Sequence, residues 1–165
     1  MGLAVVSSLH PDLRLKWPND IWLQHRKLGG ILIETVSVVE VRYAVIGVGI
    51  NISIPAANDL RTPPAALREL LPDAQAAQVL GQVVLPLVRQ VQLFASEGFG
   101  PLRAAFHARD MLYGSEVVCS DGLAGTARGV DASGALLVHT AQGLKKISSA
   151  EVSVRPQAGS RASSI

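Results

Sequence analysis

The amino-acid sequence predicts an α+β fold, a mixed or antiparallel sheet packed on helices and followed by a small β-barrel. Three observations predict it. Runs of strand character fill residues 13–51, a helical stripe of apolar residues follows from residue 76, and short β runs separated by turn signals begin near residue 111. We therefore expect two domains, residues 1–110 and 111–156, and a disordered tail at residues 157–165.

The first predicted strand, residues 13–17, should end at a turn that carries polar side chains. Pro18 fixes its own φ and disfavours helical geometry at Trp17, so the strand should stop there. Asn19 and Asp20 follow directly. An amide and a carboxylate are thereby presented at the end of a strand.

Two further runs, residues 21–24 and 28–36, are separated by the polar residues 25–27. This pattern predicts a β-hairpin with Lys27 at the start of its second strand. A third run of strand character covers residues 45–51. The three runs together predict a ligand site on a sheet.

Glycines interrupt the second and third runs, at Gly29 and Gly30 and at Gly47 and Gly49. A glycine inside a strand weakens pairing but lets a ligand or another backbone come close. Residues 47–49 do not form a dinucleotide loop, because no third glycine and no helix start follow them.

Each of these residues also has a purely structural interpretation. A lysine beside a turn is usually solvated, an Asp after Pro-Asn usually forms the turn, and paired glycines in strands usually mark bulges. The functional interpretation therefore depends on the residues as a set.

As a set, three motifs resemble biotin protein ligase, also called biotin–[acetyl-CoA-carboxylase] ligase. The motifs are Lys16-Trp17-Pro18-Asn19-Asp20, then Arg26-Lys27-Leu28-Gly29-Gly30-Ile31-Leu32-Ile33-Glu34, then Ile46-Gly47-Val48-Gly49-Ile50-Asn51. The resemblance covers residues 13–156. It implies the C-terminal part of a catalytic domain of the class II synthetase-like type, followed by an SH3-like barrel.

The resemblance also implies a reaction. Members of the family join biotin to ATP, with Mg²⁺, to form biotinyl-5′-AMP and pyrophosphate. They then transfer the biotinyl group to a lysine of a biotin carboxyl carrier domain of acetyl-CoA carboxylase. Because a carboxylate must attack a phosphorus surrounded by negative oxygens, catalysis depends on positioning and on cations.

The family's roles can be carried onto matching residues. Lys27 would bridge the biotin carboxylate and the α-phosphate, and Asp20 would hold Mg²⁺ and is a candidate base or orienting group for the acceptor lysine. The resemblance assigns biotin binding to Lys27, Gly29, Gly30, Gly47 and Gly49, and nucleotide binding to Lys16, Asn19, Asp20, Asn51 and Arg155. Glu151 is assigned with Arg155 to the nucleotide or the carrier. We expect the Lys27 amine to lie beside Asp20 and Asn51.

One departure from the family pattern lies at the beginning of the sequence. A Ser-Thr segment and a Gly-Arg loop precede the first motif in the family, and residues 1–11 match neither. Residues 2–9 instead resemble the end of the preceding helix, so we expect the chain to begin inside a catalytic domain. No helix-turn-helix domain is expected, and therefore no binding to nucleic acid.

Two alternatives stay open, the first because related enzymes also use a lysine in this neighbourhood and the second because the Gly-Arg loop is not matched. The chain could be a lipoate ligase or acyltransferase of the same superfamily. It could also be a non-catalytic fragment that docks a carrier or forms a homodimer through its sheet.

The composition of the 165 residues agrees with a reducing, cytoplasmic setting. Hydrophobic residues make up 48%, enough for a core, and the net charge of +2 includes no basic run typical of nucleic-acid binding. Cys119 is the single cysteine, and the four histidines have no metal-ligand spacing. The apolar start is too short to span a membrane.

The remaining elements follow from periodicity. Leu80, Val84, Leu87, Val91 and Phe94 predict the inward face of a helix that begins near Ala76, is kinked by Pro86 or starts there, and ends at Gly98. A second helix is expected at residues 101–109, with Leu102, Ala105 and Phe106 facing inward, and a short helix at residues 65–71. Turn signals at Asp121-Gly122, Ser133-Gly134 and Gln142-Gly143 divide the predicted barrel.

Overall fold

The computed structural model describes residues 1–56, 62–148 and 154–156. The chain divides into two compact units. Residues 1–14 and 19–90 form the first unit, and residues 15–18 and 91–165 form the second.

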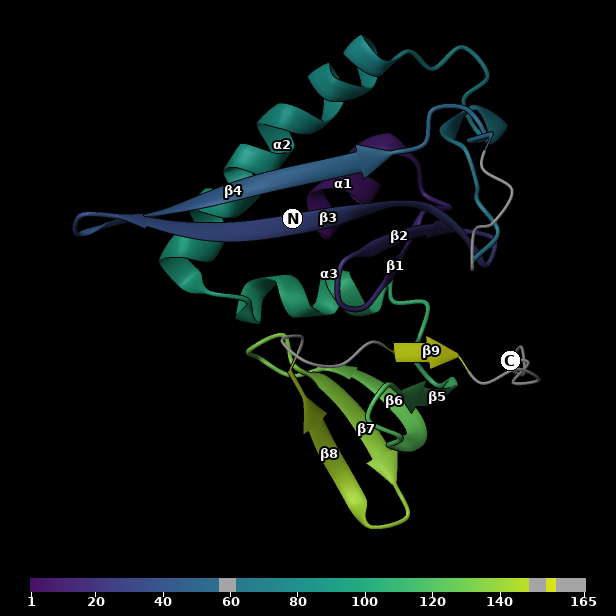
Figure 1. Cartoon of the computed structure of the whole chain (residues 1–165), viewed down its shortest axis with the longest axis vertical. Helices are drawn as coiled ribbons and strands as arrows, with labels where there is room; N and C mark the ends of the chain where they lie inside the picture. The colour runs from purple at the N-terminus through teal and green to yellow at the C-terminus, as the bar shows by residue number, and fades with distance from the viewer. Residues whose placement is uncertain (57–61, 149–153, 157–165) are drawn as a thin grey trace. The chain divides into compact units, whose positions relative to one another are not determined.

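The first unit begins with a helix and continues into a sheet (Figure 1). Helix α1, Gly2–Leu9, buries Ala4, Val5, Val6 and Leu9, so the expected helix at residues 2–9 is confirmed. Strands β1 (Arg14–Lys16), β2 (Asp20–Leu23), β3 (Arg26–Val38) and β4 (Val41–Ile50) form one sheet in the order β1-β2-β3-β4. Leu15 and Lys16 of β1 are assigned to the second unit, and β2, β3 and β4 to the first. The 3-10 helix η1, Leu67–Glu69, is shorter than the helix expected there.

The predicted hairpin forms between β2 and β3, but its turn is shifted by one residue. Gln24 and His25 have φ values of 47° and 63°, the left-handed geometry that a two-residue hairpin turn requires. Arg26 therefore already pairs with Leu23, and Lys27 pairs with Trp22. Lys27 is the second residue of β3, in agreement with its predicted place at the start of the second strand.

A second, longer hairpin joins β3 to β4 in antiparallel register, from Gly29 opposite Ile50 to Val38 opposite Val41. The two strands extend beyond the predicted runs 28–36 and 45–51. Much of this hairpin is exposed. Its exposed large apolar residues are Leu32, Ile33, Val36, Val38, Val39, Val41, Tyr43 and Val45.

The core of the first unit lies at the other end of the sheet. Its fully buried large side chains come from α1, the segment before β1, β2, the start of β3 and η1: Val5, Val6, Leu13, Ile21, Leu23, Leu28 and Leu67. The root of the β3–β4 hairpin, which carries Lys27 and the glycines, is therefore anchored, whereas its tip is not.

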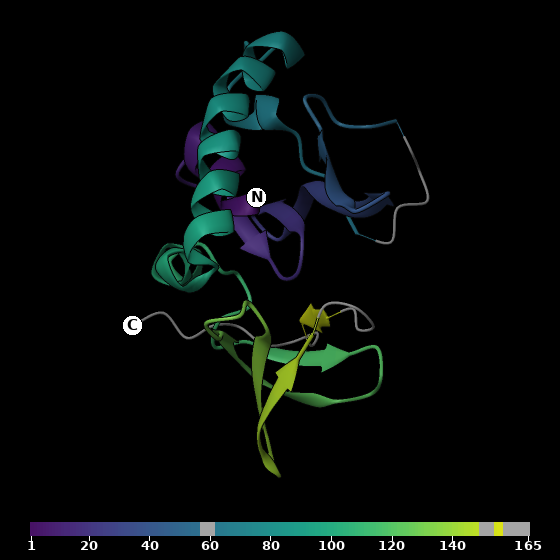
Figure 2. The same cartoon turned by 90° about the vertical axis from the view of Figure 1, so that its left-hand side faces the viewer.

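Helix α2, Ala76–Glu97, confirms the predicted helix, and Figure 2 shows it as continuous although Pro86 lies inside it. The predicted inward face is wrong. Leu80 and Phe94 are exposed, at 64% and 50%, and the buried residues are Val79 and Val83. The buried residues Val79 and Val83 each lie one position before a residue of the predicted face, so the apolar pattern of the sequence fits either of two neighbouring helix faces.

By length and composition, α2 is also apolar enough to cross a membrane. This is weak support for a membrane span, because core helices of soluble proteins share the property.

The second unit contains two short helices and a second sheet (Figure 1). Helices η2 (Gly100–Leu102) and α3 (Arg103–His107) stand where one helix, 101–109, is predicted. Of the three residues expected to face inward, Phe106 alone is buried.

Five antiparallel strands form the second sheet in the order β8-β7-β6-β5-β9. They are β5 (Glu116–Cys119), β6 (Ala124–Val130), β7 (Leu136–Thr140), β8 (Gly143–Ile147) and β9 (Val154–Pro156). The three predicted turns are present, with Gly122, Gly134 and Gly143 at positive φ. These observations confirm the α+β fold class, whereas the domain boundaries at residues 110 and 156 stay predictions. Glu151 and the predicted tail lie outside the described residues.

Candidate functional site

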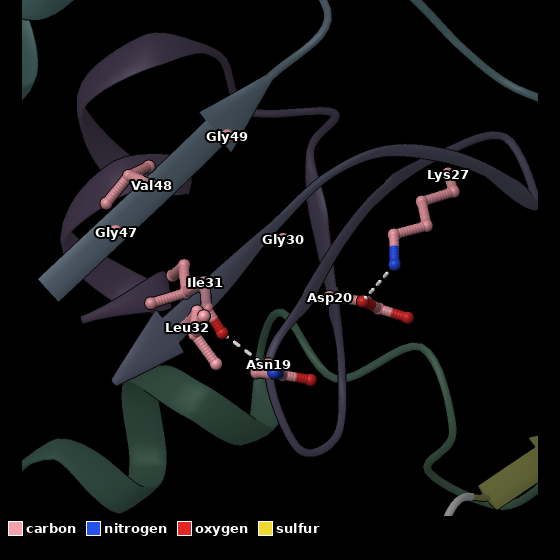
Figure 3. A pocket seen from close by; sticks show the side chains of 9 residues that line it. All are labelled: Asn19, Asp20, Lys27, Gly30, Ile31, Leu32, Gly47, Val48 and Gly49. Atoms are coloured by element: carbon pink, nitrogen blue, oxygen red, sulfur yellow. Dashed lines mark hydrogen bonds and ion pairs between the residues drawn. The ribbon is translucent and has the colours of Figure 1, made fainter. Parts of the chain in front are cut away.

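An ion pair between Lys27 and Asp20 marks the site at the root of the β3–β4 hairpin. The Lys27 Nζ lies 2.6 Å from the Asp20 Oδ1 (Figure 3). Asp20 begins β2 and pairs with Gly30 across to β3, so the two side chains reach each other over the same face of neighbouring strands. The Asp20 side chain is 19% exposed and that of Lys27 is 44% exposed. The ammonium is thus held on one side by a carboxylate and is accessible on the other.

A cavity of about 450 Å³ lies beside this pair. Its lining combines three polar side chains with strand residues of β3 and β4 (Figure 3). The lining residues are Asn19, Asp20, Lys27, Gly30, Ile31, Leu32, Gly47, Val48 and Gly49.

Three of the four predicted glycines form part of the cavity wall. At Gly30 an added Cβ would stand 3.4 Å from the Asp20 Oδ1 and 3.7 Å from the Lys27 Nζ, so this glycine lies directly against the ion pair. Gly47 and Gly49 line the cavity from β4. An added Cβ there would meet its nearest neighbours at 3.7 Å and 3.8 Å.

Gly29 has a different reason to be glycine. An added Cβ at Gly29 would stand 2.1 Å from the Gly49 backbone oxygen, a distance that no real Cβ allows. Gly29 is not among the cavity-lining residues. The structure therefore explains it by the close approach of two strands, and its predicted contact with biotin stays a prediction.

Asn19 is held in place by β3. Its Nδ2 donates to the Ile31 backbone oxygen at 2.7 Å, and the Ile31 N–H donates to the Asn19 backbone oxygen at 2.9 Å. These two bonds fix the turn after Pro18, and with it the position from which Asp20 reaches Lys27.

Asn51 contacts the main chain of Lys27 and not its amine. The Asn51 Nδ2 donates to the backbone oxygens of Lys27, at 3.4 Å, and Ala65, at 3.1 Å. Asn51 is not among the cavity-lining residues, and its nucleotide role stays a prediction. Lys16 and Arg155 belong to the second unit, so the geometry of the first unit leaves their predicted roles untested.

Several residues around the site were not predicted from the sequence. Ile31, Leu32 and Val48 also line the cavity. Strand alternation places Leu32 on the same face as Gly30 and could have found it, whereas it places Ile31 and Val48 on the opposite face. Arg26 and Glu69, which form an ion pair next to Lys27, are 43 residues apart. No local sequence pattern relates them.

The described cavity lining carries one negative and one positive side chain. Across the described ranges, no group of three or more His, Cys, Asp or Glu side chains could hold a metal ion. Asp20 is the one acidic residue in the cavity lining, and Lys27 is the one basic residue. A lysine ammonium that lies beside glycines can contact two anionic groups at once, because no side chain blocks their approach.

Two family models match separate parts of the chain. The Biotin/lipoate A/B protein ligase family matches residues 8–51, which hold the site. The biotin protein ligase C terminal domain matches residues 120–155. A biotin–[acetyl-CoA-carboxylase] ligase from Paracoccus denitrificans is 32% identical over 149 residues.

Over most of its length the chain is similar to biotin protein ligases. The Paracoccus alignment covers 85% of this chain and 62% of that protein. The bifunctional ligase/repressor BirA of Escherichia coli (strain K12) is 30% identical over 87% of this chain and 46% of its own length. The chain thus spans about half to three-fifths of these two relatives.

Solved structures of the family share the fold. The apo structure of biotin protein ligase from Aquifex aeolicus superposes with a TM-score of 0.83 at 27% identity, over 94% of this chain and 72% of that one. The same Aquifex ligase in complex with biotin and ATP gives a TM-score of 0.82 at 26% identity, over 94% and 69%.

Proposed function

We propose that the chain belongs to an enzyme that joins biotin to ATP, forming biotinyl-5′-AMP and pyrophosphate. The biotinyl group then passes to a lysine of a biotin carboxyl carrier domain. The observation that carries this proposal is the Lys27–Asp20 pair, at 2.6 Å, beside a glycine-lined cavity. A relative with 26% identity that binds biotin and ATP supports it.

In the first step Lys27 would counter the charge that builds up as two anions react. A carboxylate oxygen of biotin attacks the α-phosphorus of ATP. A bond between that oxygen and the phosphorus forms, and the bond from the phosphorus to pyrophosphate breaks. The Lys27 ammonium can donate to the carboxylate and to an α-phosphate oxygen, which lowers their repulsion. Asp20 would hold the amine on the cavity side until the reactants bind.

In the second step the acceptor lysine amine attacks the biotinyl carbonyl carbon, and AMP leaves with the bond electrons. The attacking amine must lose a proton. Asp20, 19% exposed at the edge of the cavity, is the carboxylate in the lining that could orient or accept it.

Magnesium enters this proposal as part of the ATP substrate. Mg²⁺ in proteins is commonly bound through one or two carboxylates together with substrate phosphates. Asp20 offers one carboxylate, and the described lining offers no second. The donor set therefore fits a metal that arrives with the nucleotide and is held chiefly by it.

The test is incubation of the chain with biotin, ATP, Mg²⁺ and a biotin carboxyl carrier domain, followed by mass spectrometry of the carrier. We expect an added biotinyl group that depends on all three small reactants, and an at least about 100-fold slower reaction with Lys27→Met. Lys145→Met, on β8, is the matched control. Transfer that is equally fast in both variants would overturn the assignment of Lys27.

A lipoate ligase is the second candidate, because the family matched by residues 8–51 includes lipoate ligases. The match of residues 120–155 to a biotin protein ligase domain favours biotin. Competition of lipoate against biotin in the transfer assay separates them, and we expect biotin to be used preferentially.

A homodimer through the sheet is also part of the proposal. Strand β4 is at the edge of its sheet and presents Val41, Tyr43 and Val45 to solvent. Exposed apolar edges favour strand pairing between copies. Sedimentation velocity across a range of concentrations tests this, and a concentration-independent monomer contradicts it.

The predicted cytoplasmic location stays a prediction.

A further inference from the structure

The segment of residues 63–69, which we call the clip, forms hydrogen bonds with both the backbone N–H and the backbone oxygen of Lys27. The Lys27 N–H donates to the Pro63 oxygen at 3.0 Å, and the Ala65 N–H donates to the Lys27 oxygen at 2.8 Å. Lys27 and Pro64 thus form a parallel bridge outside the main sheet. The backbone of the cavity's one lysine is therefore held by β2 on one side and by the clip on the other.

An ion pair closes the clip. Two guanidinium nitrogens of Arg26 bond the two carboxylate oxygens of Glu69, with Nη1 to Oε1 at 3.1 Å. The same Nη1 donates to the Pro64 oxygen at 3.4 Å, and the Ala66 N–H donates to the Glu69 Oε1 at 2.8 Å. The Arg26 hydrogen bonds hold the pKa of Glu69 below its usual value, so the carboxylate is charged at neutral pH.

The clip is also preformed for this contact. Pro63 and Pro64 each have a fixed φ, so the segment loses little freedom when it becomes extended. A bidentate Arg–carboxylate pair adds a defined direction to the attachment. The side chains of Arg26 and Glu69 are about one-third exposed, at 30% and 33%, and neither residue lines the described cavity.

We infer that Glu69 and Arg26 are positioning residues, which fix the main chain of Lys27 and thereby the point at which its ammonium meets Asp20. A lysine side chain has several rotatable bonds, so its reach is defined only if its Cα is fixed. Misplacement of a reacting group by about 1 Å can cost about 100-fold in rate. The effect on catalysis rests on the proposed function, whereas the effect on Lys27 itself does not.

The first experiment measures Lys27 without any assay of activity. Glu69→Gln weakens the ion pair but keeps an acceptor for Ala66, and Glu34→Gln removes the same charge from an exposed position on β3. Amide hydrogen exchange should be about 10-fold faster or more at Lys27 and Ala65 in Glu69→Gln, because their bonds to the clip open more often. Exchange at Gly30 should stay unchanged.

Competitive acetylation by acetic anhydride then reports on the Lys27 amine. In the parent chain we expect Lys27 to be acetylated more slowly than Lys145, because Asp20 holds its ammonium. Glu69→Gln should raise acetylation of Lys27 and leave that of Lys145 unchanged.

The second experiment measures biotinyl-AMP formation. Glu69→Gln should lower kcat about 10-fold and leave KM for ATP within about 2-fold. The substitution changes the position of the Lys27 ammonium and removes no contact with the nucleotide. An unchanged exchange rate at Lys27 and Ala65, or faster exchange with unchanged acetylation, overturns the inference. So does faster exchange with unchanged kcat. If the parent chain forms no biotinyl-AMP even with the carrier present, the proposed function fails, and exchange and acetylation still decide the inference.

Discussion

At the scale of single residues, the glycines of β3 and β4 differ in what an added side chain would meet. Gly29 is excluded from carrying a side chain by the backbone of β4, whereas Gly47 meets only ordinary contact distances and faces the cavity. A glycine that the close approach of the strands requires and a glycine that faces the cavity thus stand on paired strands.

This difference can be measured with two alanine substitutions. Gly29→Ala should lower the free energy of unfolding by about 2–3 kcal/mol or more, because the new methyl would overlap backbone atoms that cannot move aside. Gly47→Ala should change it by less than about 0.5 kcal/mol but weaken biotin binding. Urea unfolding and calorimetry measure the two effects. Equal stability of the two variants would show that the strands do not approach as closely as described.

Asp110 gives a pH dependence of stability. Burial raises the pKa of Asp110 to about 6, against the opposing effects of the Leu112 N–H and of His107. Among the described residues, its Oδ2 is buried without a hydrogen-bond partner. The folded state therefore keeps the proton that the unfolded chain releases near pH 4, and ionising the folded carboxyl costs free energy.

We expect the free energy of unfolding to fall between about pH 4 and pH 6 by up to about 3 kcal/mol from this group. Asp110→Asn should match the parent near pH 4 and be more stable at pH 7. Urea unfolding at both pH values measures the difference between the two proteins. A difference that does not change with pH would remove Asp110 as its source.

At the scale of elements, strand patterns predicted the sheet well and its boundaries poorly. The β2–β3 hairpin was predicted, but residues 25–27 carry no glycine or Asn-Gly signal, so nothing local indicated that the turn is Gln24-His25. The β3–β4 hairpin extends beyond its predicted runs, and Val39, a β-branched residue, occupies its turn at φ 57°. Such a turn contradicts local preference.

The Val39 turn offers a stabilising substitution. A β-branched residue in left-handed geometry costs about 1–2 kcal/mol, and glycine does not bear this cost. Val39 is 96% exposed, so its side chain contributes little packing. Val39→Gly should therefore raise the free energy of unfolding by about 1 kcal/mol in urea titrations. Val41→Gly, on the adjoining strand, is the control and should lower it.

At the scale of the whole molecule, the predictable part of the site is the part that is local in sequence. Asp20, Lys27 and Gly30 lie within eleven positions, and the motifs that contain them predicted their proximity. Arg26 pairs with Glu69 only because the chain returns to β3 through residues 63–69. The intervening sequence is rich in proline and has no apolar periodicity, so no sequence pattern predicts this pairing.

The predicted site residues are divided between the two units. Lys27, Asp20, Asn19 and the glycines belong to the first unit, whereas Lys16 and Arg155 belong to the second. The proposed adenylation chemistry depends on the first group, and the roles of the second remain proposals that the same binding assays can test.

Calorimetric titration of biotin and of biotinol, its alcohol analogue without the carboxylate, tests the central claim most directly. If the Lys27 ammonium binds the carboxylate, the parent chain should bind biotin more tightly than biotinol, and Lys27→Met should reduce that preference to about 2-fold or less. A parent chain that binds both ligands equally, or a Lys27→Met variant that keeps the full preference for biotin, would contradict it.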